Sequence, residues 1–257
     1  MSEPLGSEPV KLDLLAIGAH PDDVELCCGG TLAVLAQRGR RVGILHLTRG
    51  EAGTRGTPEQ REREGRAAAV ALGAVAVDFL NCGDGGLRTG RDEEDAVIAK
   101  LRLWRPEIVL GPSPIDRHPD HARGWELVEA ASFYSGLARR SVGEPHRPAV
   151  LLAYMQHDPF APTLIVDVTA GWPAKMAALD CYTSQLHRAA APAAAVVEAG
   201  PLPPMTRVAS PEFRASIEGR ARHYGLVIGV EFGEPYWSRL PLAVGDLVAL
   251  LEPGALR

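Results

Sequence analysis

The sequence predicts an α/β protein with a three-layer, Rossmann-like architecture: a mostly parallel sheet flanked by helices, with a C-terminal elaboration. Short apolar runs alternate with segments of helical periodicity, as in folds built from βαβ units. Two polar motifs that contain His-Pro-Asp each follow one of the apolar runs, where parallel sheets place their ligands. A chain of 257 residues that is 46% apolar is long enough to bury a sizeable core.

The expected strands are short apolar runs bounded by glycine, proline or charged residues. In chain order they cover residues 12–17, 42–47, 75–80, 105–110, 150–155 and 163–168, with residues 226–232 as a further strand or extended segment.

The expected helices are separated from these strands by turn and capping residues. They cover residues 29–37, 59–72, 92–104, 122–139, 172–186 and 211–224. The second of them has the clearest limits, with Thr57 as N-cap, Pro58 in the first turn and Gly73 at the end.

Nothing in the sequence divides the chain into independent parts. It contains no internal repeat and no low-complexity linker, so we expect a single domain over residues 1–257. The α/β core is expected over about residues 10–188, and a lid or C-terminal elaboration over about 189–257. Residues 189–204 are rich in Ala and Pro with little periodicity, which indicates a loop, a lid or an interface arm.

Charge and composition exclude several classes of partner. The net charge of −5 and the pI near 5.9 give no reason to expect nucleic acid or an anionic membrane surface. No apolar run approaches the ~20 residues that span a bilayer, and residues 1–9 lack a signal pattern. The four cysteines show no disulfide spacing. We therefore expect a cytoplasmic protein with reduced cysteines.

The two motifs, residues 18–25 and 116–121, predict one metal site. His20 and Asp23 are three residues apart in a turn that follows a strand, and imidazole nitrogen and carboxylate oxygen both bind zinc. His121 from the second motif would complete a His/Asp/His set that leaves a fourth position open for water. Iron(II) accepts the same ligands, so Zn²⁺ is the expected cofactor with Fe²⁺ as the alternative.

The remaining polar residues of the motifs suit hydrolysis at that metal. Asp22 is the expected general base for the attacking water. His118, when protonated, would stabilise a tetrahedral oxyanion and give a proton to the leaving amine. Asp120 is expected to orient an imidazole, with Asp116 or Glu25 as alternatives for that supporting role.

These motifs are also where a known family becomes recognisable. The chain resembles the zinc-dependent PIG-L or LmbE-like deacetylases, which remove acetyl from N-acetylglucosamine joined to another group, in residues 19–25, 29–32 and 118–121. The resemblance implies zinc on His20, Asp23 and His121, with Asp22 as base and His118 as acid or electrostatic stabiliser. It therefore agrees with the assignment made from the chemistry of the residues.

Within this family the chain is most similar, from about residue 12 to 250, to the deacetylases of N-acetylglucosaminyl-L-malate in bacillithiol biosynthesis. Arg61 and Arg117 match positions that hold the acidic or sugar part of the substrate. Paired guanidinium groups suit the two carboxylates of malate, and Arg55 is a weaker third candidate. Asp84 is expected to hold sugar hydroxyls. Near the C-terminus, Phe232 stands where close relatives can carry tyrosine.

The sequence thus predicts a hydrolase that releases acetate from an N-acetylglucosamine conjugate. The alternatives are the same chemistry on a mycothiol-type inositol conjugate, a chitobiose-like sugar or a thiol conjugate, and a non-catalytic metal- or sugar-binding protein. A dinucleotide-binding oxidoreductase is disfavoured because the first strand lacks a Gly-x-Gly-x-x-Gly turn after it. From the resemblance alone, a small amino-sugar substrate and a homo-oligomer are the expected partners.

Overall fold

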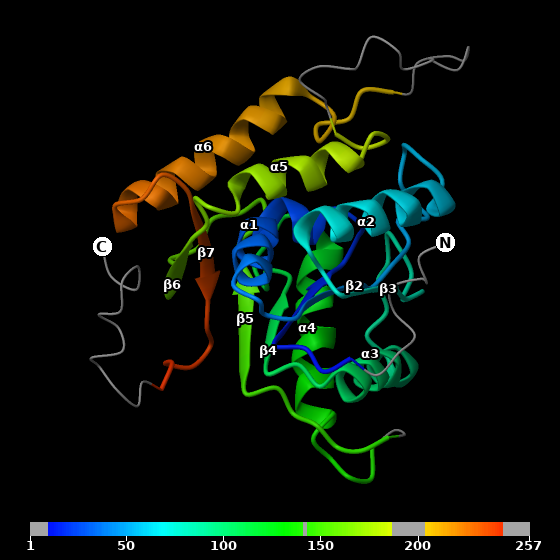
Figure 1. Cartoon of the computed structure of the whole chain (residues 1–257). Coiled ribbons are helices and arrows are strands. Elements are labelled where there is room, and N and C mark those ends of the chain that lie inside the picture. The colour runs from blue at the N-terminus through cyan, green and yellow to red at the C-terminus, as the bar shows by residue number, and fades with distance from the viewer. Residues whose placement is uncertain (1–9, 141–142, 187–203, 244–257) are drawn as a thin grey trace.

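The computed structural model describes residues 10–140, 143–186 and 204–243 (Figure 1). Strands and helices alternate over residues 14–154, and the α/β class is confirmed. In chain order the elements are β1 (Leu14–Gly18), α1 (Asp23–Gln37), β2 (Val42–His46), α2 (Pro58–Leu72), β3 (Ala76–Phe79), α3 (Arg91–Trp104), β4 (Ile108–Gly111), α4 (Pro119–Tyr134), β5 (Val150–Tyr154), β6 (Leu164–Asp167), α5 (Trp172–Cys181), α6 (Pro211–Ile228) and β7 (Gly233–Trp237).

The strands form one sheet in the order β3-β2-β1-β4-β5-β7-β6. Neighbouring strands from β3 to β5 are parallel, whereas β7 is antiparallel to both β5 and β6. The chain moves outward from β1 to β3 and then returns to the other side of β1 with β4. The strand order therefore reverses between β1 and β4. In open α/β sheets, ligands bind outside the carboxyl ends of the strands at such a reversal.

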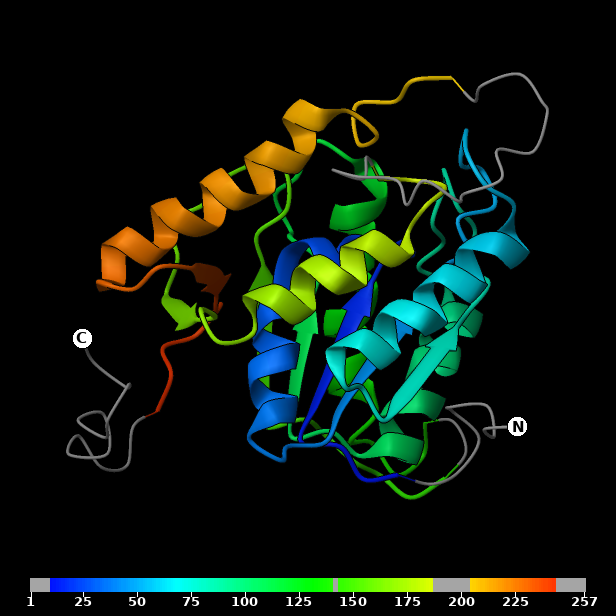
Figure 2. The same ribbon diagram turned by 45° about the horizontal axis from the view of Figure 1, so that its top comes forward.

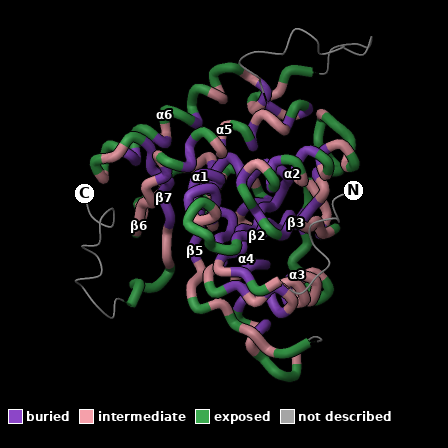
Figure 3. The backbone as a smooth tube through the Cα atoms, viewed as in Figure 1, coloured by how far each residue is buried: buried purple, intermediate pink, exposed green. Residues whose placement is uncertain are grey.

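Helices cover both faces of the sheet, which gives the three predicted layers (Figures 1 and 2). On one face α1, α2 and α5 pack together, and residues such as Leu26 and Ala178 join them to one apolar cluster. On the other face α3 and α4 form a second cluster around residues such as Val97 and Leu127. The sheet and the inner helix faces are the buried part of the molecule, as Figure 3 shows. No described helix is long and apolar enough to cross a membrane.

The structure corrects two of the predicted elements, one near each end of the described chain. The strand or extended segment expected at residues 226–232 is wrong, because α6 continues to Ile228 and is capped by Gly229 with φ of 74°. The strand β7 starts only at Gly233. Helix α1 begins at Asp23 rather than at residue 29, so the first motif leads directly into it. The predicted loop or lid lies outside the described residues except at Pro204.

A buried ion pair connects β7 to α1 and α5. The Lys175 ammonium lies 2.6 Å from the Glu234 carboxylate, and the two side chains are only 2% and 3% exposed. Glu234 also accepts hydrogen bonds from the backbone N–H groups of Gly30 and Thr31, at 2.9 and 2.8 Å, and from the Thr31 hydroxyl at 2.7 Å. The last described strand is thus fixed to the middle of the helix that begins at Asp23.

We expect Gly30→Ala to destabilise the fold. A Cβ at Gly30 would lie 2.7 Å from Val168 Cβ and 2.9 Å from Glu234 Oε1, so the buried network would have to shift. Overpacking of this kind costs about 1–3 kcal/mol. The matched control is Gly219→Ala in α6, where an added Cβ meets nothing within 4 Å, and the better helix former should add stability. Urea denaturation of both variants tests this, and a Gly30→Ala protein as stable as the wild type contradicts it.

Candidate metal and catalytic site

The first motif forms a tight turn between β1 and α1. The His20 N–H donates to Asp23 Oδ2 at 2.8 Å, and the Asp23 N–H returns to the His20 carbonyl at 3.3 Å. Gly18 allows this turn, because a Cβ there would lie 3.1 Å from the His20 carbonyl and 3.2 Å from Asp23 Cβ. The turn places His20 and Asp23 on the same side, as the sequence predicts.

Asp22 has an unusual backbone conformation for a residue other than glycine, with φ of 110°. Residues in such regions cost about 1–3 kcal/mol and concentrate at functional sites. The buried Arg61 guanidinium supports the turn by donating to the carbonyls of Pro21 at 2.6 Å and Gly50 at 3.3 Å. It also lies 3.7 Å from the Asp22 carboxylate. Burial raises the pKa of Asp22 to about 7, although the charge of Arg61 opposes the rise.

The second motif is organised by Asp116. Its carboxylate accepts the His118 N–H at 2.9 Å and faces His121 Nδ1 at 2.8 Å. His118 is the N-cap of α4, because its Nδ1 accepts the Asp120 N–H at 3.3 Å, and Pro119 follows it in the first turn. Asp116, one of three candidates for the supporting role, therefore lies where its carboxylate can orient His121.

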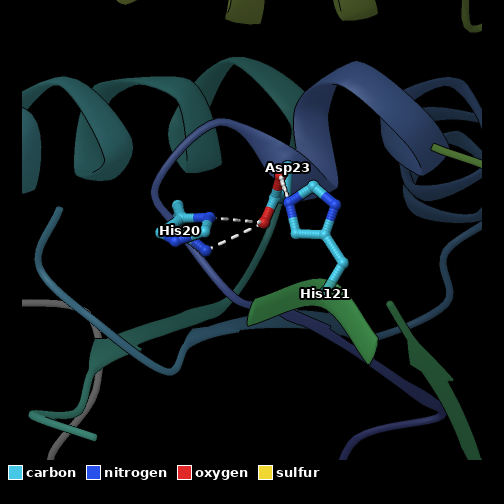
Figure 4. A group of neighbouring side chains, drawn as sticks. All are labelled: His20, Asp23 and His121. Carbon is cyan, nitrogen blue, oxygen red and sulfur yellow. Dashed lines mark hydrogen bonds and ion pairs between the residues drawn. The ribbon is translucent and has the colours of Figure 1, made fainter. Parts of the chain in front are cut away.

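The two motifs meet at Asp23, as Figure 4 shows, with the imidazoles of His20 and His121 on either side of its carboxylate. His20 Nδ1 lies 3.4 Å from Asp23 Oδ2, and His121 Nε2 lies 3.3 Å from Asp23 Oδ1. The three side chains are buried, and their ligand atoms all lie within 4.8 Å of one another. The residues predicted as metal ligands therefore form one cluster that could hold a metal ion.

The other nitrogen of each imidazole has a carboxylate partner. His20 Nε2 lies 3.1 Å from Asp84 and 3.3 Å from Asp120, and His121 Nδ1 faces Asp116. An N–H that donates to a carboxylate leaves the opposite nitrogen free as a ligand, which is the usual arrangement around metal-binding histidines. In both imidazoles the free nitrogen is the one that faces Asp23. The donor set and its orientation thus fit a divalent cation.

The charges in the cluster are arranged around Asp23. Burial alone would raise the pKa of Asp23. The neighbouring charges of His121 and His20 instead hold this pKa well below its usual value. Burial opposes the charged form of His121 too, but Asp23 and Asp116 outweigh it and raise the pKa of His121 to about 9. The buried Asp23 carboxylate is thus a favourable place for positive charge, which is what a divalent cation supplies.

His118 lies beside the cluster rather than in it. Its ring contacts His20 edge to face with centroids 4.9 Å apart, and stacks on His121 at 4.7 Å. Burial and the charges of His20 and His121 lower its pKa. His118 thus borders the expected metal position without filling it, which suits a group that contacts the reacting substrate.

The predicted substrate-binding residues have different surroundings. Arg117 is exposed and forms no ion pair with a described residue. Arg55 donates to the Ser184 carbonyl at 2.7 Å, and Arg61 is buried under the turn described above. Asp84 is in the cluster, where it contacts His20 and accepts the Ala52 N–H at 2.8 Å. Of the three arginines, Arg117 has the guanidinium that is most open to a ligand.

Two further residues of interest in the sequence lie away from the cluster. Glu25 accepts a hydrogen bond from the Tyr182 hydroxyl at 2.9 Å and forms no hydrogen bond or ion pair with either imidazole. Burial raises the pKa of Glu25 to about 8. Phe232 stacks on Trp172 with centroids 4.2 Å apart in the apolar core. Neither side chain is therefore positioned to bind the metal or orient its ligands.

Sequence reasoning missed Gln156. Its side-chain amide donates to Asp23 Oδ1 at 3.1 Å, and its carbonyl oxygen accepts the Ser113 N–H at 3.1 Å. Gln156 follows β5, the neighbour of β4, so its position after a central parallel strand was the available signal. The adjacent His157 lines the pocket beside the cluster, with its ring stacked on His121 at a centroid distance of 5.8 Å.

Comparison with known proteins identifies the class. A family model described as PIG-L, GlcNAc-PI de-N-acetylase, matches residues 15–132, which include both motifs. A diacetylchitobiose deacetylase from Thermococcus kodakarensis is 31% identical over an alignment of 190 positions that covers 67% of this chain and 69% of the relative. The chain therefore belongs to the PIG-L family.

Other relatives show the range of this family. A 1D-myo-inositol 2-acetamido-2-deoxy-alpha-D-glucopyranoside deacetylase from Actinosynnema mirum is 28% identical, covering 67% of this chain and 80% of the relative. A 4-oxalmesaconate hydratase from Pseudomonas putida is also 28% identical, covering 67% of this chain and 74% of the relative. Among solved structures, the conserved protein TT1542 from Thermus thermophilus is 36% identical with a TM-score of 0.80, covering 92% of this chain and 98% of that one.

Proposed function

We propose that this protein is a zinc-dependent deacetylase that hydrolyses the N-acetyl group of an N-acetylglucosamine conjugate, with N-acetylglucosaminyl-L-malate as its substrate. The observation that carries this proposal is the buried His20, Asp23 and His121 cluster, with Asp22 and His118 next to it. The family and its deacetylase relatives support the amide chemistry, and the exposed Arg117 supports an acidic conjugate.

A divalent cation held by His20, Asp23 and His121 would polarise the amide carbonyl and make water more acidic. Asp22 takes the proton of the attacking water, and the turn held by Arg61 keeps its carboxylate at the cluster. His118, whose Nδ1 accepts the Asp120 N–H, donates a hydrogen bond from its other nitrogen to the oxyanion. The proton that Asp22 takes from water passes to the amine nitrogen as the C–N bond breaks. The products are acetate and the free glucosamine amine. Asp120 and Asp116 keep His20 and His121 oriented.

Acetate release tests the proposal directly. The purified enzyme is incubated with N-acetylglucosaminyl-L-malate, the corresponding inositol conjugate and diacetylchitobiose, and acetate is measured. We expect release from all three or from the first alone, with the highest kcat/KM for the malate conjugate. A higher kcat/KM for the inositol conjugate or for diacetylchitobiose would mean that this compound, and not the malate conjugate, is the preferred substrate. No release from any of them would overturn the deacetylase function.

Metal binding has its own readout in thermal stability. Zn²⁺ added to protein treated with a chelator should raise Tm by roughly 5–10 °C, because a ligand at about 100 times its Kd adds ~2.7 kcal/mol. His121→Gln should abolish the response. The matched control is His223→Gln on the exposed part of α6, which should keep it. A His121→Gln protein with the wild-type response would mean that zinc binds elsewhere.

Arg117 is expected to act in substrate binding. Arg117→Ala should raise KM for the malate conjugate by about tenfold or more with little change in kcat, because a charge-assisted hydrogen bond to a carboxylate is lost. Steady-state kinetics on the malate conjugate measure both values. An unchanged KM would remove Arg117 from carboxylate recognition.

A further inference from the structure

A cavity of about 230 Å³ lies between the metal site and helix α6. Asp23, Gln156 and His157 line it on the side of the cluster. Phe213 and Ile217 of α6 contribute apolar lining. The cavity is smaller than the ~300–1,000 Å³ of pockets that hold a complete drug-sized ligand. It is therefore large enough for one part of a substrate whose scissile amide is at the metal.

Two arginines give this cavity a positive charge. Arg207 and Arg220 both line it, and neither forms an ion pair with any residue in the described ranges. Arg220 is held in place by backbone carbonyls, because its guanidinium donates to Gln156 and, at 3.1 Å, to Leu26. The side chain of Arg207 is exposed and makes no hydrogen bond to a described residue. A guanidinium has five N–H donors, so both side chains keep donors for a ligand.

The only carboxylate in the lining cannot neutralise these arginines. Asp23 is already shared by His20, His121 and Gln156. The opposite flank of the site is acidic, since Asp84 and Asp120 both contact His20 there. An acidic group on a substrate would be repelled from that flank and attracted to the cavity. The cavity side of the site thus attracts an anion, whereas the side of Asp84 and Asp120 suits neutral or cationic groups.

We propose that this cavity is the subsite for a carboxylate on the aglycone of the substrate, and that Arg207 and Arg220 bind that carboxylate. This proposal rests on the proposed deacetylase function and specifies which part of its substrate decides selectivity. Guanidinium forks match the geometry of carboxylates, and the apolar side chains of Phe213 and Ile217 strengthen the attraction by excluding water. Residues of α6 and of the segment before it would thus determine which conjugates the enzyme accepts.

The test compares an acidic and a neutral substrate in matched variants. Arg207→Met removes the exposed cavity arginine, and Arg222→Met removes an arginine of α6 that instead pairs with Glu218 and Glu231. For each protein, kcat/KM is measured with N-acetylglucosaminyl-L-malate and with diacetylchitobiose. The measured quantity is kcat/KM for the malate conjugate divided by kcat/KM for diacetylchitobiose. We expect Arg207→Met to lower this ratio by about tenfold or more, and Arg207→Glu to lower it further. Arg222→Met should leave the ratio unchanged.

A binding measurement makes the result independent of turnover. Calorimetric titration with free L-malate should show binding to the wild type and to Arg222→Met, and a loss of binding in Arg207→Glu. The uncharged diamide of malate should bind none of these proteins. An unchanged substrate ratio in Arg207→Met, or wild-type malate affinity in Arg207→Glu, overturns the subsite. If the wild type releases acetate from neither substrate, the deacetylase function fails. The malate titration alone then decides whether the cavity binds a carboxylate.

Discussion

Asp22→Asn should lower kcat by between about 100-fold and 10,000-fold while zinc binding stays intact, because general-base catalysis contributes on this scale. The asparagine keeps the size of the side chain but cannot accept a proton from water. Asn is also a better replacement than Ala, since it tolerates the positive φ of 110° at this position. The effect on turnover can then be separated from an effect on the turn that positions His20 and Asp23.

Acetate release and zinc content per protein molecule are the two measurements. Glu25→Gln is the matched control, because Glu25 is also buried in the first turn of α1 but contacts Tyr182 instead of the cluster. It should retain most of the wild-type kcat. Full activity in Asp22→Asn would remove Asp22 from the mechanism. Loss of zinc together with activity would show that the carboxylate supports the metal site instead of taking the proton.

Lys175→Met should be the most destabilising of the substitutions considered, by about 3–5 kcal/mol, because it leaves the carboxylate of Glu234 buried without its cation. Glu234 keeps hydrogen bonds from Gly30 and Thr31, but neutral N–H groups do not replace a full positive charge. The double variant Lys175→Met with Glu234→Gln removes both charges and retains an oxygen acceptor. It should recover a substantial part of the lost stability.

Urea denaturation gives the free energy of unfolding of each variant. The control is Lys11→Met, which breaks a pair with Glu107 at 2.9 Å whose side chains are 63% and 50% exposed. The free energy of unfolding of Lys11→Met should fall by no more than about 1 kcal/mol. A Lys175→Met protein that is no less stable than Lys11→Met would show that the buried pair does not hold β7 to α1.

The sequence was sufficient to predict the fold class and the cluster of metal-ligand candidates, for a reason that lies in the topology. Both motifs follow strands that turned out to be β1 and β4, the two strands between which the sheet order reverses. Their position after apolar runs was visible in the sequence, and parallel pairing brings such positions together. The central strands β1, β2 and β4 were predictable because buried parallel strands are almost continuously apolar. The predicted strand at residues 163–168 also overlaps β6, although β6 is antiparallel to β7 and only half-buried.

Other features could not be predicted because they depend on long-range contacts. Leu226 and Val227 resemble strand residues, yet they are exposed at the end of α6 and precede Gly229, which ends the helix. Arg61 has the charge expected of a substrate ligand, but its burial under the turn of Asp22 depends on the packing of α2. Gln156 gave only a weak signal, its position after a strand, because an amide there becomes significant only when its contact with Asp23 is known.

The contacts of Glu234 also bear on biosynthesis. Helix α1 is translated long before β7, because Glu234, which contacts Gly30 and Thr31, stands 204 and 203 positions after them. A nascent chain that stops short of β7 lacks the counter-charge of Lys175 and the acceptor for these N–H groups. Long-range contacts of this kind form late in folding. Native packing around the first helix is therefore completed only after translation has passed the final strand.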